Sequence, residues 1–166
     1  MAKKAKKRQL DMIINFVVTL LGLAAIVMMF LPNVGINDSD TTYTGLQIAF
    51  GYNRKVGNSE VAVFNFSFMN LLTFILAAVG VVFTVLGALG KGSKFAAFIA
   101  AGAFIVAGVF FFLSISFCLP NQTALDIGSI FGANVKDALH LAVGAIVGGV
   151  VSLLAGIAQL GRVFLK

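Results

Sequence analysis

The chain has 166 residues and a net charge of +6, with 60% hydrophobic but only 11% charged residues. A soluble helical protein carries a charged face on each helix, so this composition excludes that class. It favours a chain that lies mostly in lipid, and we expect the basic excess to face a membrane surface and not nucleic acid.

Four stretches without formal charge follow one another along the chain: Met12–Asn37, Val61–Gly90, Phe95–Leu125 and Ala138–Gly161. A helix needs ~20 apolar residues to cross ~30 Å of hydrocarbon. The sequence therefore predicts an all-α membrane protein in which one domain, 1–166, forms a four-transmembrane-helix bundle. The expected spans are about 10–31, 66–89, 95–119 and 137–160.

The ends of the spans have local signals. Pro32 and Pro120 cannot continue a helical hydrogen-bond ladder, and they end the first and third spans. The turn at 90–94 is short, so the second and third spans should form an antiparallel hairpin. Two outer loops remain, a larger one at 32–65 and a smaller one at 120–136.

The first outer loop contains a predicted short helix. Thr44 suits the N-cap, Gln47 its capping-box partner, and Gly51 the C-terminal stop. Alternation of apolar residues leaves a strand open as the alternative here, and 60–64 could be a strand or the start of the second span. Either structure should cap the outer side of the bundle through an apolar loop surface: Leu46, Ile48, Phe50 and Tyr52.

Charge asymmetry predicts the orientation. Nine of the twelve basic residues lie before the first span, between the second and third, or after the fourth. The positive-inside rule then places both termini in the cytoplasm, and a multi-pass protein of the cell (plasma) membrane is expected. The first basic cluster could also bind anionic lipid, through Lys3, Lys4, Lys6, Lys7 and Arg8.

Small residues recur at helical spacing within the spans. Membrane helices associate through such residues, because they allow close approach of the backbones. The predicted helix-packing residues are Ala77, Gly80, Thr84 and Gly87 in the second span, and Gly144, Gly148, Ser152 and Gly156 in the fourth. They could serve this bundle or a second copy of the chain.

Polar side chains within the spans have two interpretations. They could line a hydrophilic path, or they could make hydrogen bonds between packed helices, which is the interpretation that we favour. The residues are Asn15, Thr19, Asn70, Thr73 and Ser114, together with Thr84, Ser152 and Gln159.

The ionisable residues of the outer side suggest one candidate site. Asp137 and His140 are three residues apart near the start of the fourth span, and Asp126 could join them in a pH-sensing or metal site. The alternative is that Asp137 simply stabilises the N-terminus of a helix. We expect no cofactor and no enzymatic activity, and the single cysteine, Cys118, should be an apolar filler.

Two resemblances add to this interpretation. The sequence Phe30-Leu31-Pro32 and the run from Tyr43 to Gly51 resemble small uncharacterised four-span membrane proteins of Gram-positive-type bacteria, which imply no particular activity. In topology the chain is similar to claudin-type tetraspan proteins, but it lacks the tryptophan and the paired cysteines of the claudin first loop, so strand-mediated adhesion is not implied.

The sequence favours a non-enzymatic membrane protein that acts by association. It would be an accessory or scaffold subunit, whose partner is a second copy or a larger membrane complex. The alternatives are a subunit of a pore or channel, including a lysis pore, and, less favoured, a small transporter or membrane enzyme.

Overall fold

The computed structural model describes residues 2–56, 58–121 and 135–164, without the side chains of residues 2–8, 56 and 135. Four long helices dominate the described chain: α1 (Ala2–Met28), α3 (Phe68–Ala88), α4 (Lys94–Phe112) and α6 (Val143–Phe164). Each contains a stretch long and apolar enough to cross a membrane. The prediction of four such helices is confirmed.

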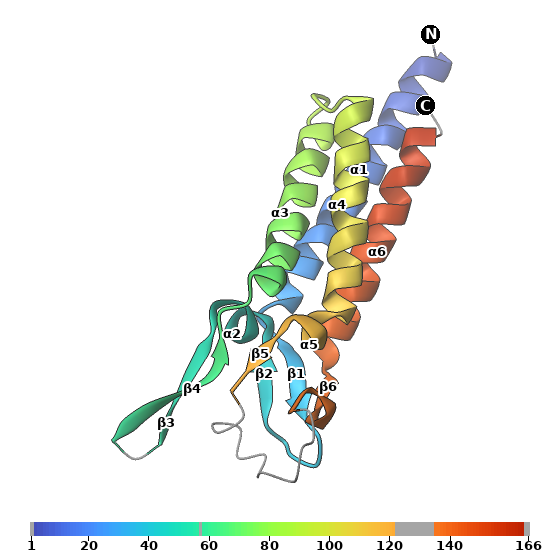
Figure 1. Cartoon of the computed structure of the whole chain (residues 1–166). Coiled ribbons are helices and arrows are strands. Elements are labelled where there is room, and N and C mark those ends of the chain that lie inside the picture. Colours follow the sequence, from blue (N-terminus) through green and yellow to red (C-terminus); the bar gives the residue numbers. More distant parts are fainter. Residues whose placement is uncertain (1, 57, 122–134, 165–166) are drawn as a thin grey trace.

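The long helices pack side by side. α1 lies against α3 and α6, and α4 lies against the same two helices, so each helix neighbours the next one in the chain (Figure 1). This is the arrangement of an up-and-down four-helix bundle. Both chain termini lie at one end, which we call the terminal end, and the strands lie at the other, the sheet end.

Short elements join the helices at the sheet end. The strands of the first connection are β1 (Pro32–Ile36), β2 (Thr42–Thr44), β3 (Tyr52–Val56) and β4 (Ser59–Asn65), with α2 (Gly45–Phe50) between β2 and β3. The second connection contains α5 (Ser114–Phe117), β5 (Leu119–Pro120), the 3₁₀ helix η1 (Val135–Ala138) and β6 (Leu139–Leu141).

The helix bounds depart from the sequence expectation at the sheet end. The first helix ends at Met28, and Pro32 starts a strand. The third ends at Phe112, before the single turn of α5. The fourth begins at Val143, because the residues before it form η1 and β6, and β6 pairs with β1.

Two antiparallel sheets of three strands form the cap of the bundle. In the first, with order β2-β1-β6, the chain before α6 meets the chain after α1, and His140 lies opposite Gly35. In the second, with order β3-β4-β5, Leu119 lies opposite Asn65. Both sheets therefore tie the second connection to the first.

The predicted helix of the first loop is confirmed. The hydroxyl of Thr44 accepts a hydrogen bond from the backbone N–H of Gln47 (3.2 Å), and the Gln47 side chain accepts one from the backbone N–H of Thr44 (2.9 Å). This is a complete capping box, and the helix ends at Gly51, whose φ of 88° favours glycine.

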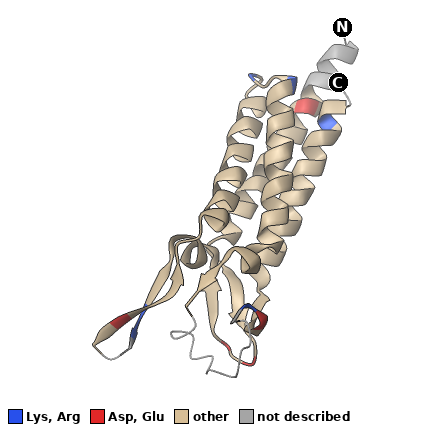
Figure 2. Ribbon diagram, in the orientation of Figure 1, with Lys and Arg blue, Asp and Glu red and all other residues tan. Residues whose placement is uncertain are grey.

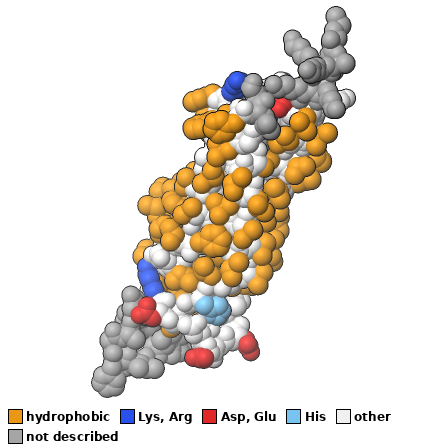
Figure 3. All heavy atoms as spheres, turned by 90° about the vertical axis from the view of Figure 1, so that its right-hand side faces the viewer, with side chains coloured by type: hydrophobic (Ala, Val, Ile, Leu, Met, Phe, Trp, Pro, Cys, Tyr) orange, Lys and Arg blue, Asp and Glu red, His pale blue; other side chains and the backbone are white. Residues whose placement is uncertain are grey.

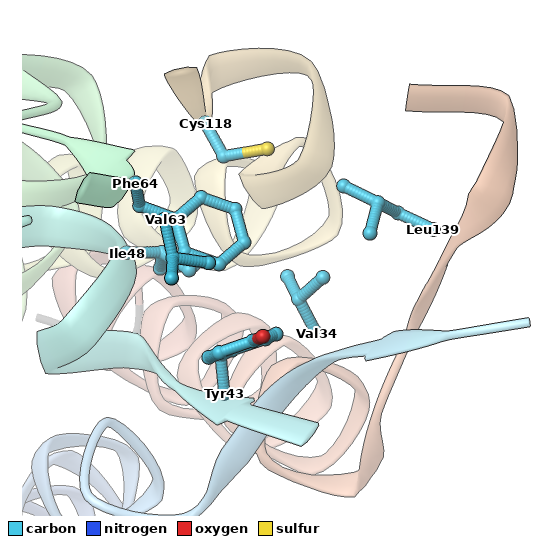
Figure 4. Close-up of a cluster of buried hydrophobic side chains, with 7 residues drawn as sticks. All are labelled: Val34, Tyr43, Ile48, Val63, Phe64, Cys118 and Leu139. Carbon is cyan, nitrogen blue, oxygen red and sulfur yellow. The ribbon is translucent and has the colours of Figure 1, made fainter. Parts of the chain in front are cut away.

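The cap has an apolar core of its own. Seven buried side chains from both connections meet between the sheets (Figure 4): Val34, Tyr43, Ile48, Val63, Phe64, Cys118 and Leu139. The ring of Tyr43 packs edge-on against Phe64, with centroids 4.8 Å apart. The cap is therefore a folded unit in contact with the bundle, and not a pair of loops.

Candidate functional site

The small-residue stripes lie inside the bundle. On α3 the predicted helix-packing residues Ala77, Gly80, Thr84 and Gly87 form a buried seam with the polar Asn70 and Thr73. On α6 the predicted Gly144, Gly148, Ser152 and Gly156 are all buried. These stripes bring the helices of one bundle together, so they are not available to a second copy.

Aromatic rings fill the space that the glycines leave. A Cβ built on Gly80 would lie 2.7 Å from Cζ of Phe104, and one on Gly22 would lie 2.6 Å from the same atom. Phe111 fills the corresponding space at Gly148. Glycine is required where an aromatic ring from another helix of the bundle takes the place of a side chain.

The polar residues at the terminal end form one cluster. Nε of Arg162 lies 3.7 Å from a carboxylate oxygen of Asp11, and the Gln159 side chain donates to Oδ1 of Asn15 (3.3 Å). One turn further into the bundle, the hydroxyl of Thr19 donates to that of Thr84 (3.0 Å). We call these six residues, Asp11, Asn15, Thr19, Thr84, Gln159 and Arg162, the terminal polar cluster.

Two members, Arg162 and Asp11, are not among the polar residues predicted within the spans. The sequence places Arg162 with the cytoplasmic charges that follow the fourth span, but in the structure it lies within α6, and its side chain is only 4% exposed. A signal was present, because Gln159 and Arg162 continue the stripe of Gly156 in steps of three residues. Its partner on α1 follows the same logic, since Asp11, Asn15 and Thr19 are four residues apart.

The terminal polar cluster is not fully satisfied. Nε of Arg162 and Oε1 of Gln159 are buried and have no hydrogen-bond partner among the described residues. Such atoms are expected to bind water when the site is large enough.

A second group of polar residues lies at the sheet end. The side chain of Asn70 donates to the Ser67 hydroxyl (3.1 Å) and to the carbonyl of Ser114 (3.2 Å). Ser67 donates to the carbonyl of Phe117 (2.6 Å), and Thr73 donates back to its own helix at Met69. The bonds from Asn70 and Ser67 to the backbone of α5 hold α3 against α5.

Apolar layers separate the two polar groups. One layer contains Val18, Phe104 and Ala155, and the other contains Ala25, Met29 and Phe111, all of them buried. Between the groups, Ser152 donates its proton to the carbonyl of Phe104 (2.8 Å). The predicted polar residues Asn15, Thr19, Asn70, Thr73 and Ser114 are buried or half-buried, but they do not form a continuous path.

The structure describes two of the three residues of the predicted outer-face site, Asp137 and His140. Asp126 lies outside the described residues, Asp137 lies in η1, and His140 lies in β6 and not on the fourth helix. Nδ1 of His140 lies 3.0 Å from Oδ1 of Asn37, whose amide donates to the backbone carbonyl of Asp137 (3.1 Å). The described contacts therefore join the two through Asn37 and a backbone carbonyl, and they hold β6 against the loop after β1.

The predicted loop surface mostly faces inward. Ile48 is buried in the cap core, Tyr52 packs against that core, and Leu46 packs against the apolar layer around Phe111. Of these four residues only Phe50 is strongly exposed, at 58%.

Within the described residues, no group of three histidine, cysteine or acidic side chains could hold a metal ion.

The outward part of the cap is a polar hairpin. β3 and β4 extend away from the bundle (Figure 1), and the exposed side chains near their turn belong to Asn53, Arg54, Lys55, Asn58, Ser59 and Glu60. Burial raises the pKa of Tyr43, although the positive charge of Arg54 opposes this shift in part. The hairpin itself contributes Tyr52, Val61 and Phe64 to the cap core or its border, whereas its far end is charged.

The thiol of Cys118 is buried in the cap. Burial raises the pKa of Cys118 to about 11, although Lys136 opposes the shift. Its Sγ lies 3.0 Å from the carbonyl of Ile115, to which the thiol donates. A thiol with a raised pKa is a poor nucleophile, which fits a packing role.

The surface of the bundle is apolar. Large apolar side chains are strongly exposed on all four helices, for example Phe16, Val82, Phe98 and Ile157. Hydrophobic side chains cover the middle of the face seen in Figure 3, whereas the charged residues gather at the two ends in Figure 2. Such a surface fits lipid, with water at both ends.

Comparison with known proteins gave no relatives: neither a family model, nor a curated protein, nor a solved structure matches the chain.

Proposed function

We propose that the chain is a non-enzymatic multi-pass membrane protein that acts by association, as an accessory or scaffold subunit of a membrane complex. In this proposal the four long helices form a membrane-embedded bundle. The plasma membrane holds the protein with its termini in the cytoplasm and its cap outside. Lipid surrounds the bundle. Anionic lipid binds the basic residues of the first cluster, whose side chains lie outside the described part of the structure: Lys3, Lys4, Lys6, Lys7 and Arg8.

The observation that carries the proposal is the cap. Two sheets and a separate apolar core are built from the connections between helices, and a charged hairpin extends from them. A protein that needed only to cross the bilayer could use short turns, as this chain does between α3 and α4. A folded, projecting cap offers a rigid surface to a partner.

The small-residue stripes pack inside the bundle, and this limits which surfaces of the protein could bind a partner. Since Gly80, Gly148 and Gly156 face side chains or backbone of their own bundle, they cannot also drive helix contacts between copies. The proposal therefore assigns recognition to the cap. A pore through a single bundle is not favoured, because the layers of Phe104 and Phe111 interrupt the polar residues.

The test is the size of the protein in its native membrane. Chemical crosslinking in membranes, followed by native electrophoresis in mild detergent, should give a species larger than one chain. Shortening the hairpin, by replacing residues 53–60 with a two-residue turn, should abolish it while the bundle stays folded. A chain that is monomeric in the membrane and in detergent would exclude association.

A further inference from the structure

The outer edge of β3 is open in the described structure. In the sheet β3-β4-β5, β3 pairs only with β4, so its other side is an edge of the described sheet. The hairpin carries this edge away from the bundle (Figure 1). An edge strand presents unpaired N–H and C=O groups that can pair with another chain.

The register identifies which groups face outward. Val56 pairs with Ser59, and two residues separate them in the sequence, so they form the hydrogen-bonded pair that closes the hairpin. Hydrogen-bonded and non-hydrogen-bonded pairs alternate from there. Asn53 and Lys55, opposite Ala62 and Glu60, therefore direct their backbone N–H and C=O groups away from β4.

The side chains at this edge are basic. Arg54 and Lys55 are both exposed, and as neighbours in a strand they project from opposite faces. Glu60 offsets one of the two charges, which leaves the described hairpin with one net positive charge (two basic residues against one acid). On one face Lys55 lies opposite Glu60, which offsets its charge, whereas on the other face Arg54 lies opposite the uncharged Val61 and provides the positive charge that a partner strand would meet.

These charges select between the two kinds of strand that could pair. Antiparallel pairing of β3 with β3 of a second copy would bring basic side chains close together, and like charges across strands are destabilising. An acidic strand would gain from the same two residues. Repulsion of the wrong partner together with attraction of the right one is a common basis of specificity.

We propose that the open edge of β3 binds an extended acidic segment of a partner protein by strand addition, with the backbone of Asn53 and Lys55 pairing and Arg54 and Lys55 contacting acidic side chains. The inference rests on the proposed function, because it names the partner class of the same cap. Main-chain bonds would provide the affinity and the two basic residues the preference for acid.

The experiment compares three variants of the full-length protein in its native membrane. Arg54→Glu/Lys55→Glu reverses the charge, Asn53→Pro removes one outward N–H without removing a bond to β4, and Arg54→Lys/Lys55→Arg keeps the charge. We expect the first two to reduce the assembled fraction at least tenfold and the third to leave it unchanged. A photoreactive residue at Lys55 should capture a segment with more acidic than basic residues.

The outcomes separate this inference from the proposed function. If the wild-type chain forms no assembly, both fail. If it assembles and the charge-reversed and proline variants assemble equally well, association stands and strand addition at β3 is wrong. Capture of a basic segment, or of a second copy of this chain, also overturns the inference. Unchanged melting temperatures of the variants in detergent serve as the folding control.

Discussion

At the scale of single residues, two glycines of the same bundle differ in how much space lies around them. A Cβ on Gly144 would lie 2.7 Å from the backbone carbonyls of Met28 and Pro32, and it would also meet the side chain of Asn33. A Cβ on Gly102 would meet nothing within 4 Å. The side-chain amide of Asn33, with its nitrogen toward the carbonyls of Met28 (2.8 Å) and Leu31 (2.9 Å), caps α1 and cannot move without loss of these bonds.

These surroundings predict different effects of one methyl group. Gly144→Ala should destabilise the protein by about 1–3 kcal/mol, because the helices must separate or the cap of α1 must shift. Gly102→Ala should be neutral or stabilising by up to about 1 kcal/mol, since alanine favours helix. Thermal unfolding in detergent measures both. Equal effects of the two substitutions would show that α6 does not pack against the end of α1 as described.

The buried thiol of Cys118 makes stability depend on pH. Its pKa is raised from 9.0 to about 11, so the folded protein keeps a proton that the unfolded chain releases above pH 9. Stability should therefore fall as the pH rises from 9 toward 11. Cys118→Ala should remove this part of the dependence, and Tyr43, which is present in both proteins, cancels. Denaturation at pH 8 and pH 10 tests the difference, and identical slopes for both proteins would contradict it.

At the scale of elements, the features that the sequence predicts are those that depend on residues within one segment. The seam of α3 and the capping box of α2 need only the spacing of residues within one segment, and the structure has both. Pairing of β6 with β1 joins residues about a hundred positions apart, and three residues carry too little pattern to predict it. For this reason His140 and Asp137 were expected on a helix that begins only at Val143.

The residues of the candidate site also divide into those that spacing within one segment predicts and those that depend on contacts between distant segments. Buried polar residues such as Asn15, Asn70 and Thr73 were identified from their helical faces. The apolar layers between them depend on where Phe104 and Phe111 enter the bundle, which one sequence does not specify. The burial of Arg162 likewise depends on α1, which supplies Asp11 from the other end of the chain.

The pair of Asp11 and Arg162 should couple α1 to α6. Removal of the carboxylate leaves the guanidinium of Arg162, which is only 4% exposed, without this ion pair, so Asp11→Asn should destabilise by about 2 kcal/mol. Arg162→Gln should cost less, because the side chain of Asp11 is 23% exposed, and the double variant should lose less than the sum, because the buried charge of Arg162 is then absent. Unfolding in detergent provides all four values of the cycle. Additive losses would mean that the two groups do not interact.

At the scale of the whole molecule, two separate interiors are stacked end to end. The bundle packs small residues against aromatic rings and leaves its outside apolar, which suits lipid. The cap buries an apolar core and exposes polar residues on its hairpin, as a water-soluble domain does. We therefore expect the boundary of the membrane at the sheet end to lie where these two patterns meet.

Orientation is the prediction that belongs to this scale. If the positive-inside bias holds, the cap faces out and the turn between α3 and α4 faces the cytoplasm. In a Cys118→Ala background, Asn58→Cys places a thiol at the exposed hairpin turn and Lys91→Cys places one at the opposite end. A membrane-impermeant maleimide added to intact cells should label the first variant and not the second. Labelling of Lys91→Cys only after the cells are opened is the internal control. The reverse pattern would place the cap in the cytoplasm, where a partner for the β3 edge would have to be sought among soluble proteins.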